Sequence, residues 1–186
     1  AGGEIKGKKL GVIGLGAIGV LIANASSDLG MEVYGYDPYL TIKAAWSLSS
    51  KIIQTDSIED MLKICDYITV HVPLNDGTKG IINRENMKLM KSNAVILNFA
   101  RGGIIDDQAA VDAVASGQIG KYVTDFPNNI VIGKEGVICV PHLGASTDEA
   151  EENCAEMVSA QLKDFLETGN IKNSVNFPAC KLAYNG

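Results

Sequence analysis

Three glycines and one acidic residue form the first group of residues in this chain that fits a chemical task. Gly14, Gly16 and Gly19 match G-x-G-x-x-G, and Asp37 follows at close to the fingerprint's spacing of about 20 residues. The glycines would permit a tight turn, close approach of backbone to a pyrophosphate, and close helix–strand packing. Asp37 would accept the ribose hydroxyl groups of NAD and repel the extra phosphate of NADP. Its alternative role is a turn residue before Pro38.

Two basic residues follow expected strands and are surrounded by turn residues. Arg101 stands between Ala100 and Gly102, where a guanidinium is suited to clamp a substrate carboxylate or polarise a carbonyl, or else lies in a surface turn. His142 lies just past a strand end and is the better acid/base candidate. His71 ends another strand, and we expect it to contact a ligand or to be a satisfied core residue.

Alternating strands and helices must position these residues. We expect strands at residues 10–13, 31–36, 51–54, 67–72, 94–99, 122–126 and 137–140. We expect helices from about residue 17 and at residues 57–65, 83–91, 106–116 and 146–167, with helix or loop at 41–50. This order predicts a Rossmann-type doubly wound α/β fold, with a mostly parallel sheet and helices on both faces. The ligand crevice of such a sheet lies at the carboxyl ends of its strands.

Composition narrows the classes of partner. The 186 residues are 46% hydrophobic with a net charge of −6, which predicts a buried core and argues against nucleic acid as a partner. The uncharged stretch at residues 10–27 is marginal in length for a membrane span and is broken by glycines, so we expect no membrane association. The four cysteines are scattered without a C-x-x-C motif, which favours reduced thiols in a cytoplasmic protein and no metal site. They are Cys65, Cys139, Cys154 and Cys180.

Four motifs, taken together, resemble the cofactor domain of the NAD-dependent D-2-hydroxyacid dehydrogenases. They are GLGAIG at residues 14–19, HVPL at 71–74 with Thr78 shortly after, NFARGGIIDDQA at 98–109, and VPHLGAST at 140–147. The resemblance covers nearly the whole chain. It is strongest to the family members that act on 3-phosphoglycerate, which implies hydride transfer between C2 of that acid and the nicotinamide C4.

The resemblance implies roles for the matched positions. Arg101 would bind the 2-oxo acid, and His142 would be the general acid in reduction and the general base in oxidation. Residues implied to contact NAD are Gly14, Gly16, Ala17, Ile18, Gly19, Asp37, His71, Val72, Pro73, Thr78, Phe99, Ala100, Arg101, Thr124, Asp125, His142, Gly144 and Ala145.

One departure from the family pattern concerns the partner of His142. The family usually shows A-L-D-V-F-x-x-E-P, with the aspartate near the nicotinamide amide and the glutamate paired with the histidine. Aligned on Phe126, Thr124 takes the aspartate's place and Asn129 the catalytic glutamate's, whereas a gap of one residue gives the amide role to Asp125. A neutral amide stabilises imidazolium far less than a carboxylate does. We therefore expect an acid limb of activity at lower pH than the family's.

The expected organisation is a cofactor domain at residues 1–169 and a tail at 170–186 that begins a return segment. The family's substrate domain comes from chain on both sides of the cofactor domain, and neither flank is in this sequence. We therefore expect an excised domain or a natural fragment that binds NAD with little activity, with dimerisation through this domain. The alternatives are a dehydrogenase of another D-2-hydroxy acid, an NAD-sensing corepressor-like module, and an S-adenosylmethionine-dependent methyltransferase.

Overall fold

The computed structural model describes residues 3–181 of the chain. They divide into two compact units, with the boundary between His142 and Leu143. The sequence instead places the end of the cofactor domain at residue 169. Residues 182–186 of the expected tail lie outside the described residues.

The first unit is built on one parallel sheet of seven strands in the order β3-β2-β1-β4-β5-β6-β7. The order reverses between β1 and β4, which defines the topological switch point of the sheet. The Rossmann-type doubly wound fold predicted from the sequence is therefore confirmed. The strands are β1 (Lys9–Ile13), β2 (Glu32–Tyr36), β3 (Ile53–Gln54), β4 (Tyr67–Val70), β5 (Val95–Asn98), β6 (Lys121–Thr124) and β7 (Val137–Cys139).

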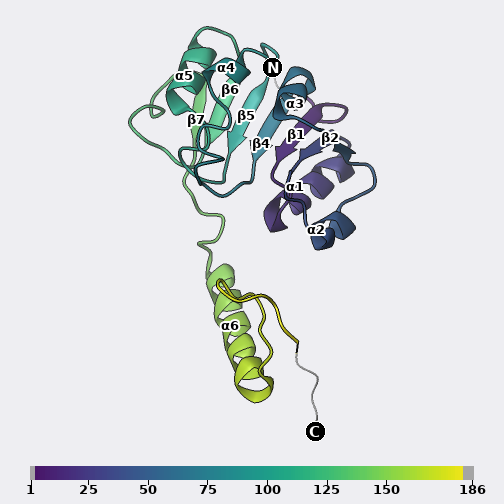
Figure 1. The fold of residues 1–186 in the computed structure, drawn as a ribbon. Helices are drawn as coiled ribbons and strands as arrows, with labels where there is room; N and C mark the ends of the chain where they lie inside the picture. Colours follow the sequence, from purple (N-terminus) through teal and green to yellow (C-terminus); the bar gives the residue numbers. More distant parts are fainter. Residues whose placement is uncertain (1–2, 182–186) are drawn as a thin grey trace. The chain divides into compact units, whose positions relative to one another are not determined.

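Helices cover both faces of this sheet (Figure 1). One face carries α1 (Ala17–Asp28) and α2 (Ile42–Ser47). The other carries α3 (Ile58–Ile64), α4 (Arg84–Met87) and α5 (Asp107–Ala115). Because side chains alternate along a strand, each face has its own core. Val12 packs with Ala23 of α1 on one face, while Ile68 and Ile96 pack with Leu62 of α3 on the other.

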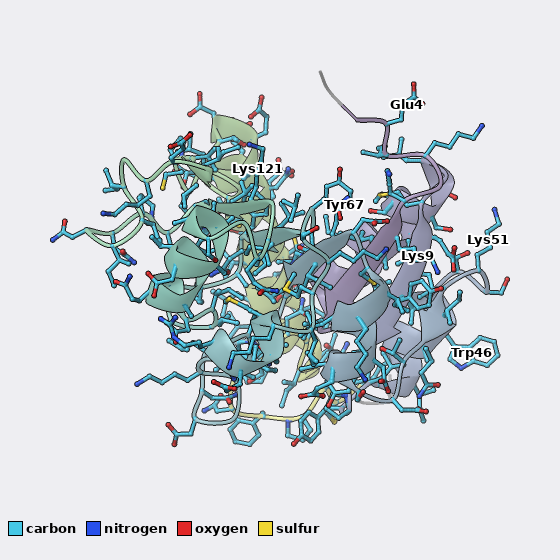
Figure 2. The ribbon with its side chains drawn as sticks, turned by 90° about the horizontal axis from the view of Figure 1, so that it is seen from above. Glu4, Lys9, Trp46, Lys51, Tyr67 and Lys121 are labelled. Carbon is cyan, nitrogen blue, oxygen red and sulfur yellow. The ribbon has the colours of Figure 1, made fainter. Side chains whose placement is uncertain are left out.

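The two edges of the sheet differ in what they present. Figure 2 looks onto the edge where the strands begin, and Lys9, Tyr67 and Lys121 start β1, β4 and β6 along it. Because all the strands run in the same direction, their carboxyl ends meet at the opposite edge. Gly14 and His71 follow β1 and β4 there. The sheet thus brings the residues that are expected to bind a ligand together at one edge.

Two helices show where the helix ends agree with those expected from the sequence and where they differ. Ser57 caps α3, with its Oγ accepting a hydrogen bond from the Asp60 N–H at 3.1 Å and donating one to the Asp60 carboxylate at 2.8 Å. The helix expected at residues 83–91 is shorter, because after Met87 the chain continues in three-residue turns. In these turns Leu89 N donates to the Asn86 carbonyl and Met90 N donates to the Met87 carbonyl.

The second unit begins at Leu143 and contains α6 (Asp148–Thr168) and the segment that follows it. Thr147 caps the helix, and Gly169 ends it in the left-handed conformation with φ of 74°. The following segment closes on itself through an antiparallel bridge between Ile171 and Cys180. A cavity of about 530 Å³ lies between this segment and the helix, with Leu162 among its lining residues.

All four cysteines are free thiols, as expected from their spacing. Cys65 is buried and the other three are exposed. Burial raises the pKa of Cys65 to about 12, so its thiol stays protonated at neutral pH. Within residues 3–181, no helix combines the length and the apolar character that crossing a membrane requires.

Candidate functional site

The glycine turn after β1 has the backbone geometry that a phosphate-binding loop needs. Gly14 has a φ of 92°, and a Cβ at Gly19 would lie 1.9 Å from the Gly14 carbonyl oxygen, so the third glycine allows the helix to approach the turn. No atom lies within 4 Å of a Cβ built at Gly16. Ala17 and Ile18 begin α1 next to it and are exposed. The amide groups at the start of α1 are therefore open to an anion.

Asp37, at the end of β2, is held in place by two backbone amides. Leu15 N donates to its Oδ2 and Tyr39 N to its Oδ1, each at 2.8 Å. The carboxylate thus bridges the glycine turn and the chain after β2. Each carboxylate oxygen retains a further lone pair, so Asp37 can still accept hydrogen bonds from a ribose.

A cavity of about 590 Å³ lies between these two segments and the end of β4. Its volume falls within the usual range for sites that bind small molecules. It brings together seven of the residues predicted to contact the cofactor, namely Gly14, Gly16, Asp37, His71, Val72, Pro73 and Thr78. The remaining lining residues are Ile13, Tyr36, Pro38, Tyr39, Asn75, Gly77 and Ile81.

His71 and Thr78 have structural partners in this wall. The His71 Nε2 lies 2.9 Å from the Thr69 hydroxyl, and burial lowers the pKa of His71 below its ordinary value. A neutral ring is suited to contact and not to carrying a charge. The Thr78 hydroxyl donates to the Pro73 carbonyl and accepts from Asn75 N at 2.9 Å, which closes the loop after β4.

Asn98 fixes the turn that presents Arg101. This buried residue ends β5, where its Oδ1 accepts from Ala100 N at 3.2 Å and its Nδ2 donates to the Arg101 carbonyl at 3.0 Å. The Arg101 side chain is exposed. Phe99 is partly exposed and lines a separate apolar groove together with Ile18.

Phe126 lies between the two residues predicted to do the chemistry. The Arg101 guanidinium lies 5.8 Å from the centre of the Phe126 ring. The ring centres of Phe126 and His142 are 4.6 Å apart, with the planes inclined at 45°. The carboxyl ends of β5, β6 and β7 thus bring Arg101 and His142 to one ring. Such contacts hold a cation and an imidazole close to each other without pairing them directly.

Asp125 is the carboxylate partner of His142. The His142 Nδ1 lies 2.7 Å from the Asp125 Oδ2, and a carboxylate can only accept, so Nδ1 is the protonated nitrogen. The expectation that His142 lacks a carboxylate neighbour is therefore wrong. Asp125 supplies the carboxylate that Asn129 does not, so the absence of the family's glutamate gives no reason to expect a lower acid limb.

The neighbours of Asp125 have other tasks. Thr124 is buried, and its hydroxyl accepts from Phe126 N at 3.1 Å. Asn129 is exposed in the following turn, and its side chain makes no hydrogen bond within residues 3–181. Asn128 instead anchors this turn, donating to the Asp107 carboxylate at 2.7 Å.

Two of the residues predicted to contact the cofactor lie outside the unit that contains the site. Gly144 and Ala145 belong to the second unit. Across residues 3–181, no group of three or more histidine, cysteine and acidic residues is arranged to hold a metal ion.

Sequence reasoning overlooked Phe126, Asn98 and Asn128 as parts of the site. A partial signal existed for Phe126, since an aromatic residue past a buried strand and before Pro127 has no evident packing role. No such signal marks the other two residues. Asn98 acts through a local bond to the Arg101 carbonyl, three residues later, whereas Asn128 acts through Asp107, which lies 21 residues earlier in the chain.

Comparisons with known proteins agree with this geometry. A family model described as D-isomer specific 2-hydroxyacid dehydrogenase, NAD binding domain, matches residues 1–144. The D-3-phosphoglycerate dehydrogenase of Methanocaldococcus jannaschii is 40% identical over 181 residues, covering 94% of this chain and 34% of that protein. The human D-3-phosphoglycerate dehydrogenase is 35% identical over 190 residues, covering 99% of this chain and 35% of that protein. The chain thus spans about a third of the length of these curated relatives.

A solved structure gives the same fold. The D-lactate dehydrogenase from Aquifex aeolicus, complexed with NAD and lactic acid, has a TM-score of 0.72 at 27% identity. The similarity covers 86% of this chain and 54% of that one.

Proposed function

The chain belongs to the D-isomer specific 2-hydroxyacid dehydrogenase family, in its NAD binding domain, and from this premise we propose the reaction that it serves. That reaction is the oxidation of 3-phosphoglycerate at C2 to 3-phosphohydroxypyruvate, the first step of serine biosynthesis. The observation that carries this choice is the identity of 35–40% to D-3-phosphoglycerate dehydrogenases over nearly the whole chain.

The carboxyl edge of the sheet contains groups that fit the adenosine and pyrophosphate parts of NAD. The amide groups around Gly16 would receive the pyrophosphate, since a Cβ built at Gly16 meets no atom within 4 Å and the start of α1 is exposed. Asp37 would accept the ribose hydroxyl groups, and its bonds to two backbone amides prevent it from turning away. Val72, Pro73 and Thr78 would form the opposite wall.

The chain's own side chains would handle the substrate and its proton. NAD, when bound, accepts the hydride that leaves C2. Arg101 would bind the substrate carboxylate and orient the hydroxyl group. In the neutral ring that is protonated at Nδ1, the His142 Nε2 has a free lone pair, and it would accept the hydroxyl proton as the carbonyl forms. Phe126 would keep the guanidinium and the imidazole at a fixed spacing.

Dimerisation and a cytoplasmic location are further parts of this proposal. Apolar side chains on α6 are exposed within the second unit, and they would support association between copies. They are Met157, Val158, Leu162, Phe165 and Leu166. Light scattering of the purified chain over a range of concentrations tests this, and a monomer at all concentrations contradicts it.

The test of the reaction uses a chimera in which this chain replaces the matching segment of the Methanocaldococcus relative. We expect NAD reduction with 3-phosphoglycerate and little with D-lactate. Preference for D-lactate would shift the assignment to another 2-hydroxy acid. The absence of turnover with both acids, despite NADH binding, would favour an NAD-sensing module. Titration of the 186-residue chain with NADH, NADPH and S-adenosylmethionine tests the methyltransferase alternative. A methyltransferase would bind S-adenosylmethionine in preference to the two nicotinamide cofactors.

A further inference from the structure

Asp107, the first residue of α5, connects two segments that carry parts of the candidate site. Its Oδ1 accepts a hydrogen bond from the Tyr122 hydroxyl at 2.8 Å, and its Oδ2 accepts one from the Asn128 side chain at 2.7 Å. Tyr122 lies on β6, and Asn128 lies in the turn that follows this strand. A single carboxylate therefore fixes the start of α5 to the strand and to the turn.

The bond from Tyr122 to Asp107 is buried in the core. The tyrosine is fully buried, and burial raises the pKa of its hydroxyl above the ordinary range, so the group is a hydrogen-bond donor at neutral pH. A buried hydroxyl without a partner is costly, which gives this bond a defined geometry. In the family pattern A-L-D-V-F-x-x-E-P, aligned on Phe126, an alanine stands in the place of Tyr122. An alanine has no group that could bond to a carboxylate, so the family pattern does not contain this link.

Asn128 connects Asp107 to the rest of the turn. Its Nδ2 donates to Asp107, while its Oδ1 accepts from Ile130 N at 2.9 Å and from Val131 N at 3.3 Å. The Val131 side chain is completely buried, so the far end of the turn is anchored in the core. Phe126 lies at the near end, two residues before Asn128. The carboxylate of Asp107 thus holds the segment that presents the Phe126 ring.

The segment that presents Arg101 leads directly into Asp107. Arg101 stands six residues before Asp107. Between them, Asp106 N donates to the Ile82 carbonyl at 2.9 Å, which fixes this segment to the chain that follows β4. The Arg101 guanidinium lies 5.8 Å from the centre of the Phe126 ring. The two groups therefore belong to segments that meet at Asp107.

We propose that Asp107 is a positioning residue that sets the distance between Arg101 and the Phe126 ring. This ring in turn contacts His142, so the same bonds place the acid/base relative to the guanidinium. The inference rests on the proposed function only for the roles of Arg101 and His142 in the reaction. A displacement of about 1 Å in such an arrangement can lower the rate about 100-fold.

The first test follows the position of the Phe126 ring in the 186-residue chain without any ligand. Because the ring centres of Phe126 and His142 are 4.6 Å apart, the ring current of the phenyl group shifts the imidazole proton signals of His142. The chain contains two histidines, and a His142→Gln variant assigns their signals. In proton NMR spectra at one pH, we expect Asp107→Ala to move the His142 signals toward their position in Phe126→Leu. The His71 signals should stay unchanged.

Two smaller changes test the two bonds separately. Tyr122→Phe removes only the hydroxyl, and Asn128→Asp keeps the acceptor for the turn amides but places a second carboxylate against that of Asp107. Both variants should move the His142 signals in the same direction as Asp107→Ala does. Gln108→Ala is the matched control from the first turn of α5, because its side chain is exposed and bonds within the same helix. It should leave the signals in place.

The second test separates positioning from a loss of stability and uses the active chimera. We expect Asp107→Ala to lower kcat/KM for 3-phosphoglycerate about 10- to 100-fold, with a lower kcat and a higher KM for this acid. Binding of ADP-ribose, which lacks the nicotinamide ring, should stay within about twofold and shows that the variant is folded. Asp107→Asn should recover most of the activity, because its amide oxygen can accept from Asn128 and its N–H can donate to the Tyr122 oxygen.

Each possible result bears on the inference. Wild-type His142 signals in Asp107→Ala, or in Tyr122→Phe should Asp107→Ala fail to fold, overturn it. An equal shift in Gln108→Ala overturns it as well, and so does a fall in kcat with unchanged KM values, which a smaller folded fraction would give. If the chimera binds NADH but does not oxidise 3-phosphoglycerate, the proposed reaction fails, and the NMR shifts still decide the role of Asp107.

Discussion

The two halves of the candidate site differ in the chemical groups that form them and in how far apart along the chain those groups lie. The adenosine half combines the backbone of the glycine turn after β1 with one side chain, the Asp37 carboxylate, which the backbone of two neighbouring segments holds in place. The catalytic half uses side chains from three separate strand ends, with Arg101 after β5, Asp125 after β6 and His142 after β7. The first half is fixed by local spacing, and the second by how distant segments meet.

This difference predicts how each half responds to change. Backbone groups tolerate no added atoms where segments touch, so substitutions in the adenosine half should affect folding or all ligands with an adenosine. Side chains at strand ends can be removed with less harm to the fold, so substitutions in the catalytic half should affect chemistry and nicotinamide contacts selectively.

The largest effect is expected for Gly19→Ala. Its Cβ would meet the Gly14 carbonyl oxygen at 1.9 Å, so the turn or the helix must move. We expect a loss of about 3 kcal/mol in the free energy of unfolding, measured by urea denaturation, and loss of NADH binding. Gly16→Ala is the matched control, since its Cβ meets nothing within 4 Å. The Gly16→Ala variant should keep the stability of the wild type and still lose affinity for NADH. Equal destabilisation by both substitutions would contradict the difference in packing between the two glycines.

Asp37→Ala should weaken NADH and ADP-ribose to the same extent. It removes the acceptor for the ribose and for two backbone amides at 2.8 Å, so a loss of about 10- to 100-fold in affinity is expected. Isothermal titration with both ligands measures this. An effect confined to NADH would mean that Asp37 contacts the nicotinamide part of the cofactor and not its adenosine part.

Phe126→Leu should act on turnover alone. Leucine preserves apolar volume but removes the ring that contacts Arg101 at 5.8 Å and His142 at 4.6 Å. We expect kcat/KM of the active chimera to fall about fivefold, equivalent to about 1 kcal/mol, with NADH affinity unchanged. A fall in NADH affinity of similar size would show that Phe126 serves the cofactor instead.

The smallest effect concerns stability and pH at His71, which borders the adenosine cavity. Burial lowers the pKa of this histidine, so the folded state binds its proton less readily than the unfolded state does. Stability should therefore fall as the pH decreases from about 8 to about 5. Thermal denaturation of wild type and His71→Gln should show a smaller fall in the variant. Equal pH dependence would mean that other groups cause it.

The limits of sequence reasoning follow the same division. Mostly apolar strands bounded by glycine, proline or aspartate, and the spacing from Gly14 to Asp37, predicted the sheet and the adenosine half because both depend on short-range order. The choice between Thr124 and Asp125 could not be made. In a sheet buried on both faces, neighbouring residues at a strand end look alike until the face of each is known. The Tyr122 hydroxyl donates to Asp107 of α5, so Tyr122 and Thr124 point to the face of the sheet that α5 covers. Asp125 points to the other side and contacts His142.

The pairing of β1 with β4 has a consequence for how the molecule folds. Lys9 N donates to the Asp66 carboxylate at the start of this pair across 57 residues of chain, whereas β1 and β2 are joined by a single helix. Closing the longer loop costs more entropy, so β4 should dock after β1, α1 and β2 have formed. The crevice at the switch point would then be among the late features to form. Amides along this seam should exchange with solvent sooner than those between β1 and β2.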